Sequence, residues 1–379
     1  MRDFVEVFGV FSVIAAIMLF PFFAFLFVLN NDALQLAGFG IALEASFIVL
    51  ALYLFNGKRH GKITAGLIML FLAVGISFAV PYYYKESLKV EDSEMMLYDY
   101  EPFTGSGKLA RLEKPASFKI EEEWPKLDGA TALYPLYAAF AEAVYPKNSY
   151  PPYDSSVQSS STPEAYERLI AGEADLIFAA GPSISQERAA KEAGVELKLT
   201  PIGREAFVFF VNSRNPIDSL KGEDIRGIYA GTIDNWKEVG GSDDKIRAFQ
   251  RPEESGSQTT FIKFMGDAPI EEPETEDVAS AMGGIINEVA SYHNYKNAIG
   301  YTFRFYSTEM VRNDKIKLLG IDGVIPTRET IRSGSYPSVS EFYAVTAGTE
   351  NPNVEPFLDW ILSEEGQKLI DETGFVSLQ

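Results

Sequence analysis

The chain has 379 residues, of which 33 are Lys or Arg and 53 are Asp or Glu, and its formal net charge is −20. A chain this acidic is unsuited to nucleic acid or to an anionic membrane surface, so an anion must bind in a local pocket of donors. No cysteine is present, which excludes disulfides, thiolate catalysis and cysteine metal sites. The length allows two or three folding units.

Apolar residues are concentrated near the N-terminus. Three runs approach or exceed the about 20 residues that a membrane-spanning helix needs: 8–29, 34–55 and 63–83. The loop 56–62 is basic whereas 30–32 is short and acidic, so the positive-inside rule predicts a cytoplasmic N-terminus. We therefore expect a three-helix, multi-pass cell-membrane anchor over 1–85, with the rest of the chain extracellular.

Glu44 lies near the middle of the second run, where a charge is costly and usually faces a partner or a cavity. It indicates either a proton or ion pathway, or a protonated carboxyl hydrogen-bonded to a neighbouring span at Ser12 or Ser77. We favour the second reading, because three spans with one ionisable residue make a poor transporter.

Residues 86–124 are polar and acidic with little periodicity, which predicts an extracellular stalk. Beyond them, strand-like and helix-like stretches alternate, which favours an α/β fold with largely parallel sheets. Ligands in such folds bind beyond the carboxyl ends of strands, where helices begin. Three loops of the chain have that position.

The first loop follows a short strand and leads into a helix over 136–144, with Pro135 in its first turn. Small residues form the crest of this turn, and their backbone N–H groups are free to face a ligand. Turns of this kind are common.

The second loop, 157–161, precedes an amphipathic helix over 165–171. Thr162 before Pro163 is a typical N-cap arrangement, and its hydroxyl can cap the helix, bind a ligand, or do both. A buried strand over 176–180 and a helix up to Ala193 follow.

The later elements alternate in the same way. We expect extended runs over 197–212, 245–249, 298–303 and 339–347. Between them we expect a helix and turn over 218–229 and a loop over 232–241 that docks one tryptophan. Long helices are expected over 280–292 and 354–372.

The third loop, 251–260, joins an arginine, a carboxylate and small hydroxyl residues around Gly256, where a loop becomes a helix. A helix N-terminus carries unpaired N–H groups and a partial positive charge, which suit an anion, and Arg251 can form a two-pronged contact with an oxyanion. The alternative is a well-capped helix start in a surface loop. The matching position of all three loops favours a binding site.

From about residue 125 to the C-terminus, the sequence resembles the PstS-like phosphate-binding proteins of ABC transporters. The resemblance is carried by DGATALYPLY, SSSTPEAYERLIAGEADLIFAAGPS, GIYAGTIDNWKEVGG, RPEESGSQT, AIGYTF and FLDWILSEEGQKLIDETGFVSL. It implies a type II periplasmic binding protein-like fold with two α/β lobes closing on one anion. Lobe one would hold 125–205 and 337–379, lobe two 206–336, with hinges near 197–212 and 339–347.

The resemblance also implies how inorganic phosphate is held: by backbone N–H groups, hydroxyls, one arginine and carboxylates, with no cofactor or metal. Carried over position by position, the ligand-binding residues are Ala130, Thr131, Ala132, Ser161, Thr162, Arg251, Glu253, Ser255, Gly256 and Ser257. The family commonly has an aspartate, or a serine followed by arginine, where this chain has Ala180 or Gly181. Glu253 would then set which anion is accepted, since a carboxylate excludes fully ionised sulfate by repulsion.

Together with the expected anchor, the resemblance implies a membrane-anchored extracellular solute-binding protein that captures inorganic phosphate, or a similar oxyanion, and passes it to ABC permease subunits. Alternatives are an anion-sensing module that signals through a membrane partner, and a binder of another oxyanion. A hydrolase is disfavoured because a hydroxyl nucleophile needs a base, and beyond residue 85 the only histidine is His293. No metal-ligand cluster is evident either. We expect a binding protein and not an enzyme.

Overall fold

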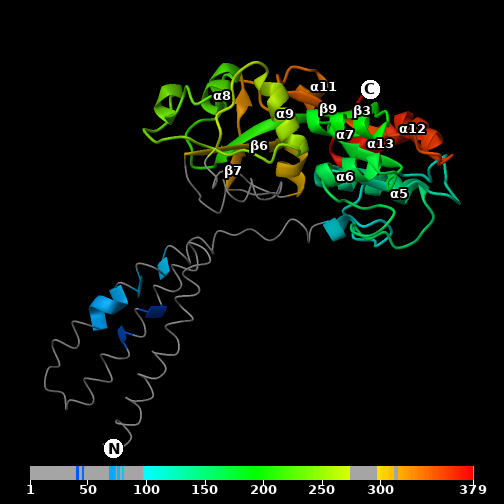
Figure 1. The fold of residues 1–379 in the computed structure, drawn as a ribbon, viewed down its shortest axis with the longest axis horizontal. Helices are drawn as coiled ribbons and strands as arrows, with labels where there is room; N and C mark the ends of the chain where they lie inside the picture. Colours follow the sequence, from blue (N-terminus) through cyan, green and yellow to red (C-terminus); the bar gives the residue numbers. More distant parts are fainter. Residues whose placement is uncertain are drawn as a thin grey trace, which may run out of the picture. The chain divides into compact units, whose positions relative to one another are not determined.

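The computed structural model describes residues 97–273, 297–310 and 315–378, together with short helical pieces between residues 40 and 80. The chain divides into two compact units, Met1–Lys89 and Val90–Gln379. The helices and strands that are labelled in Figure 1 all belong to the second unit.

The predicted membrane anchor is wrong. In the described part of the chain, no helix combines the length and the apolar character needed to cross a membrane. The predicted runs otherwise lie outside the described residues, as does Glu44. The three transmembrane helices and the multi-pass membrane localisation are therefore not supported.

The second unit is built on one mixed sheet. Its strand order is β1-β2-β9-β3-β6-β5, with β10 and β7 also paired to β3. The strands are β1 (Leu127–Gly129), β2 (Leu176–Ala179), β9 (Val339–Thr346), β3 (Lys198–Asn212), β6 (Ala298–Phe303), β5 (Arg247–Ala248), β10 (Val376–Ser377) and β7 (Ile316–Leu318). A separate two-stranded sheet pairs β4 (Ser219–Leu220) with β8 (Gly320–Ile321). The expectation of largely parallel sheets is wrong, because β3 runs antiparallel to β9, β6, β7 and β10.

Strand β3 divides this unit into two lobes. Its residues Lys198–Ala206 pair with β9, whereas Phe207–Val211 pair with β6. The strand is buried from Ala206 to its end, which explains its apolar second half. Figure 1 shows β3 and β9 between one group of elements that includes α8 and β6 and another that includes α5, α12 and α13.

A buried ion pair lies where β3 changes partners. Glu205 Oε1 is 3.3 Å from Arg304 Nε, and both side chains are almost fully buried. Arg304 also donates from Nη2 to the carbonyl of Gly374, and the N–H of Phe305 donates to Glu205 Oε2. Burial raises the pKa of Glu205, against the opposing charge of Arg304. These contacts tie the end of β6 to the hinge and to the C-terminal helices.

Lobe one is formed by the strands next to β9 and by five α-helices. They are α5 (Tyr134–Val144), α6 (Thr162–Ile170), α7 (Ile184–Ala193), α12 (Val354–Leu362) and α13 (Glu364–Thr373). The expected single C-terminal helix is broken at Ser363, whose extended backbone ends α12 and begins α13. Thr162 was expected to cap α6, but it is the first helical residue, and Ser161 takes the N-cap position.

Residues 97–124 pack against lobe one instead of forming a stalk. A short 3-10 helix, η1 (Tyr98–Tyr100), begins the segment. Leu97, Leu109 and Ile120 are buried in the same core as α5 and α13, which the acidic composition of the segment did not predict. Its backbone is held by lobe-one side chains, since the N–H of Phe103 donates to Glu142 and that of Ser117 to Glu365.

Lobe two carries three α-helices in its described residues: α8 (Gly222–Tyr229), α9 (Gly256–Met265) and α11 (Arg328–Arg332). The expected tryptophan loop is the 3-10 helix η3 (Trp236–Val239), and Trp236 is buried with Nε1 donating to the carbonyl of Asn297. The predicted helix over 280–292 lies outside the described residues.

Candidate functional site

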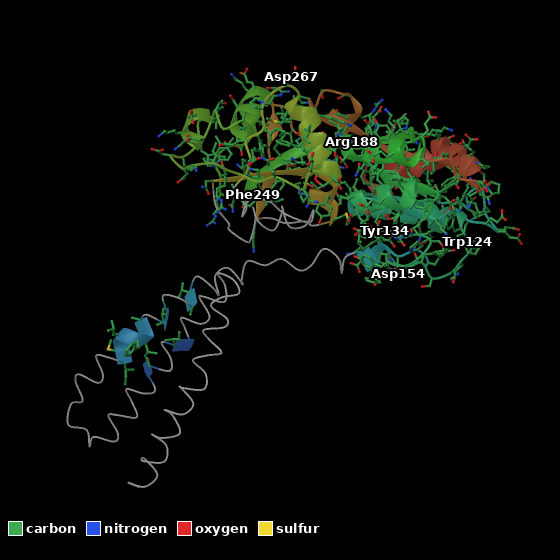
Figure 2. The ribbon with its side chains drawn as sticks, viewed as in Figure 1. Trp124, Tyr134, Asp154, Arg188, Phe249 and Asp267 are labelled. Atoms are coloured by element: carbon green, nitrogen blue, oxygen red, sulfur yellow. The ribbon has the colours of Figure 1, made fainter. Side chains whose placement is uncertain are left out.

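A cavity of about 610 Å³ opens between the two lobes. Loops from both lobes line it, including all three that the sequence singled out. Figure 2 shows Asp154, which lines this cavity, in lobe one, and Phe249, two residues before Arg251, in lobe two. The lining residues that carry polar groups are Thr131, Asp154, Gln158, Ser159, Ser160, Ser161, Thr162, Glu164, Glu167, Arg168, Arg251, Ser255 and Tyr306.

Arg251 provides a buried cation on the lobe-two wall. Arg251 comes shortly after β5 in the chain, and the residue is 8% exposed. The backbone N–H donates to Gln258 Oε1 and to the hydroxyl of Tyr301, each at 3.1 Å, so the main chain is fixed. Within the described structure, guanidinium atoms Nε and Nη1 have no hydrogen-bond partner. Burial lowers the pKa of Arg251 to about 10, which leaves it charged at neutral pH.

The N-terminus of α9 follows this arginine. Ser255 is the N-cap, and its hydroxyl accepts the N–H of Gln258 at 3.2 Å. The remaining first-turn N–H groups give this end of the helix a partial positive charge. Next to the cap, the buried Ser257 Oγ has no partner among the described residues. This wall therefore holds more hydrogen-bond donors than it satisfies.

The lobe-one wall is the N-terminus of α6. Ser161 lies at φ +86° and ψ 166°, a region that residues other than glycine rarely adopt. Thr162 is buried and Pro163 lies in the first turn. Two helix N-termini thus line one cavity. Where α9 meets lobe one, a Cβ added to Gly256 would lie 3.2 Å from Thr162 Oγ1 and 3.4 Å from the Cβ of Ala180, so a larger residue would crowd these neighbours.

Asp128 fixes the lobe-one loop and was missed by sequence reasoning. Its carboxylate is fully buried. It accepts hydrogen bonds from the N–H and the hydroxyl of Ser160 at 2.8 Å, and from Gln158 Nε2 at 3.0 Å. It also accepts from the N–H of Gly129 and pairs with Arg168 Nε at 3.0 Å. The only sequence signal was an acidic residue within the apolar stretch that becomes β1.

Seven of the ten predicted ligand-binding residues line the cavity: Ala130, Thr131, Ser161, Thr162, Arg251, Ser255 and Gly256. Ala132 and Ser257 are buried beside it without lining it. Glu253 is exposed and does not line the cavity. The structure therefore does not place the predicted selectivity carboxylate at the site.

The acidic side chains that do line the cavity are Asp154, Glu164 and Glu167, and all three are exposed. In the regions that the structure describes, no group of three or more acidic, histidine or cysteine side chains is arranged to hold a metal ion. The chemistry of the site is that of an anion-binding pocket, with one buried cation and two helix N-termini.

The model of the PBP superfamily domain matches residues 126–365, which is more than half of the chain, so the chain belongs to this superfamily. Among curated proteins it is similar to the phosphate-binding protein PstS of Bacillus subtilis. The two are 29% identical over 255 residues, covering 66% of this chain and 79% of the relative. PstS of Staphylococcus saprophyticus is 24% identical over 265 residues, covering 67% and 80%.

Among solved structures, the chain is similar to a putative phosphate ABC transporter substrate-binding protein with bound phosphate from Clostridium perfringens. The TM-score is 0.52 at 24% identity, and the match covers 69% of this chain and all of that one. At this identity the likeness shows the fold alone. The expected resemblance to PstS-like proteins and the two-lobed α/β fold are confirmed.

Proposed function

We propose that this chain is a solute-binding protein that captures inorganic phosphate between its two lobes for an ABC-type uptake system. The proposal is supported by membership of the PBP superfamily and by curated relatives that are named phosphate-binding proteins. ABC permease subunits are the partners that such a role requires. The relatives are named for binding, and catalysis has no part in the proposal.

The observation that carries the proposal is the buried Arg251, which lines the cavity and whose Nε and Nη1 have no partner among the described residues. A buried charge is costly unless it is paired, so this position favours an anion. A tetrahedral oxyanion can receive two parallel N–H donors from an arginine and further donors from a helix N-terminus. The residues that would hold it are Arg251, Ser255, Gly256, Ser161 and Thr162.

The proposal is tested by calorimetric titration of the full-length protein with phosphate and with sulfate. We expect one phosphate site per chain, with a dissociation constant well below about 1 mM, which corresponds to about −4 kcal/mol. The absence of any heat of binding for either anion at millimolar concentration would contradict the proposal.

A matched control separates the local site from the overall charge. Arg188 is an exposed arginine on α7 and does not line the cavity (Figure 2). Arg188→Ala removes the same charge from the chain as a change at Arg251, so phosphate affinity should stay within a factor of about two because exposed charges are screened by salt. A large loss in this variant would mean that long-range charge, and not the pocket, governs binding.

A further inference from the structure

The cavity is larger than an inorganic anion requires. Its volume of about 610 Å³ lies in the range of about 300–1,000 Å³ that is typical of pockets for drug-sized ligands. The donors that suit an oxyanion are gathered at Arg251 and at the starts of α6 and α9. Gly256 of lobe two already lies close to Thr162 of lobe one, so this volume remains although the lobes meet at that point.

The rest of the wall has a different character. Leu97, Tyr153 and Tyr306 line the same cavity with apolar and aromatic groups; Leu97 and Tyr306 are buried and Tyr153 is half-buried. Leu97 is 2% exposed, and the ring of its neighbour Tyr98 packs edge-on against Tyr153 at 6.0 Å. An inorganic phosphate carries only oxygen atoms around its phosphorus, so apolar contacts contribute nothing to its binding.

Leu97 belongs to the segment that precedes the residues matched by the superfamily model, 126–365. The segment is held against lobe one by the bond from the Phe103 N–H to Glu142 and by the ion pair of Arg111 with Glu142. Leu97 therefore joins the cavity wall from outside the matched residues, whereas Tyr153 and Tyr306 lie within them.

The charge at the opening narrows the choice of ligand. Asp154, Glu164 and Glu167 line the cavity as exposed carboxylates. Arg168 also lines it, but its guanidinium is already paired with Asp128 and Glu173 at 3.0 Å each. A second anionic group on a ligand would thus meet repulsion, whereas a hydroxyl or an ammonium group would not.

From these observations we infer that the pocket accepts phosphate monoesters of small neutral or cationic alcohols. The phosphoryl group lies at Arg251 and the organic group lies against Leu97 and Tyr153. The inference deepens the proposed function and rests on it, since the same residues hold the phosphoryl group in both cases.

The test is a competition titration of the full-length protein. Inorganic phosphate, glycerol 3-phosphate, phosphoethanolamine and 3-phosphoglycerate are compared by calorimetry. We expect the first three to compete for one site with affinities within about tenfold of each other, and 3-phosphoglycerate to bind at least about tenfold more weakly than glycerol 3-phosphate because of its carboxylate.

Variants of the apolar wall test whether its side chains contact the organic group of the ligand or only stabilise the fold. Leu97→Ala and Tyr153→Ala should weaken glycerol 3-phosphate binding by about tenfold or more, as expected for lost apolar contacts in a pocket, and should leave phosphate affinity within about twofold. The matched control is Leu109→Ala, an equally buried leucine of the same segment that does not line the cavity. It should alter neither affinity.

The outcomes are distinguishable. If phosphate binds but glycerol 3-phosphate fails to displace it even at about a thousandfold excess, the inference is overturned and the proposed function stands. Equal losses of both ligands in Leu97→Ala and Tyr153→Ala would also overturn it. If none of the ligands binds, the proposed function fails as well.

Discussion

The two walls of the cavity are built on the same plan but differ in how their polar groups are satisfied. Each wall is a loop that ends at a helix N-terminus, α6 in lobe one and α9 in lobe two. In lobe one, Asp128 accepts hydrogen bonds from the loop backbone, from two of its side chains and from Arg168. In lobe two, Arg251 Nε and Nη1 and Ser257 Oγ have no partner within the described structure.

This difference separates two roles. The lobe-one wall is held rigid by its own carboxylate, so its shape does not depend on a ligand. The lobe-two wall retains a buried guanidinium whose Nε and Nη1 have no partner among the described residues, and a bound anion would pair with it. An anion should therefore raise the free energy of unfolding by mass action, by about 2.7 kcal/mol at a concentration one hundred times its dissociation constant.

The largest expected effect is on Arg251. Arg251→Ala should weaken phosphate binding by about a hundredfold to several thousandfold, because breaking a buried ion pair costs about 3–5 kcal/mol. The free protein should lose no stability, since the variant removes a buried unpaired charge. Arg251→Lys should bind with intermediate affinity, because it keeps the charge but loses the two-pronged contact. Calorimetry and thermal unfolding measure both quantities, and an unchanged affinity would place the anion elsewhere.

The next largest effect is on stability and concerns Asp128 in the lobe-one wall. Asp128→Ala should lower the free energy of unfolding by about 3 kcal/mol, because it leaves Arg168 and the Ser160 N–H without their buried acceptor. Asp128→Asn keeps one acceptor and should cost less. Urea unfolding measures the difference. A loss below about 0.5 kcal/mol for Asp128→Ala, the range of ordinary surface changes, would show that the loop holds itself without the carboxylate.

A smaller effect is expected where the walls meet. Gly256→Ala places a Cβ against Thr162 and Ala180, so the lobes must separate by a few tenths of an ångström. We expect phosphate affinity to fall by about tenfold, or about 1.4 kcal/mol, with stability unchanged. Gly222→Ala is the matched control, because Gly222 also begins a lobe-two helix but its added Cβ would lie 3.6 Å or more from any neighbour. Equal behaviour of both variants would argue against close contact of the lobes.

The smallest expected effect is a gain in stability, in contrast to the losses predicted above. Ser161→Gly should raise the free energy of unfolding by about 1 kcal/mol, because glycine adopts φ +86° without the strain of a side chain. Ser161→Ala keeps the strain and should not be more stable than the original protein. Thermal unfolding compares them. If Ser161→Gly is destabilised, the hydroxyl contributes more than the backbone strain costs.

Local sequence determined the helix starts of the site. The small hydroxyl residues around Gly256 and the Thr162-Pro163 pair indicated where α9 and α6 begin, to within a residue, because capping depends on neighbours in the chain. The expected extended run over 197–212 likewise corresponds to β3. Seven of the site residues that the family resemblance implied line the cavity.

Only the tertiary structure decided which side chains face the cavity. Glu253 lies two residues from Arg251 in sequence, yet it is exposed, whereas Asp128 lies far away in sequence and anchors the opposite wall. The acidic segment 97–124 was expected to be a stalk, but its few apolar residues, such as Leu97 and Ile120, find the core of lobe one. Local patterns report a residue's immediate neighbours. Burial, unpaired charge and the shape of a cavity depend on contacts between segments that the chain brings together only on folding.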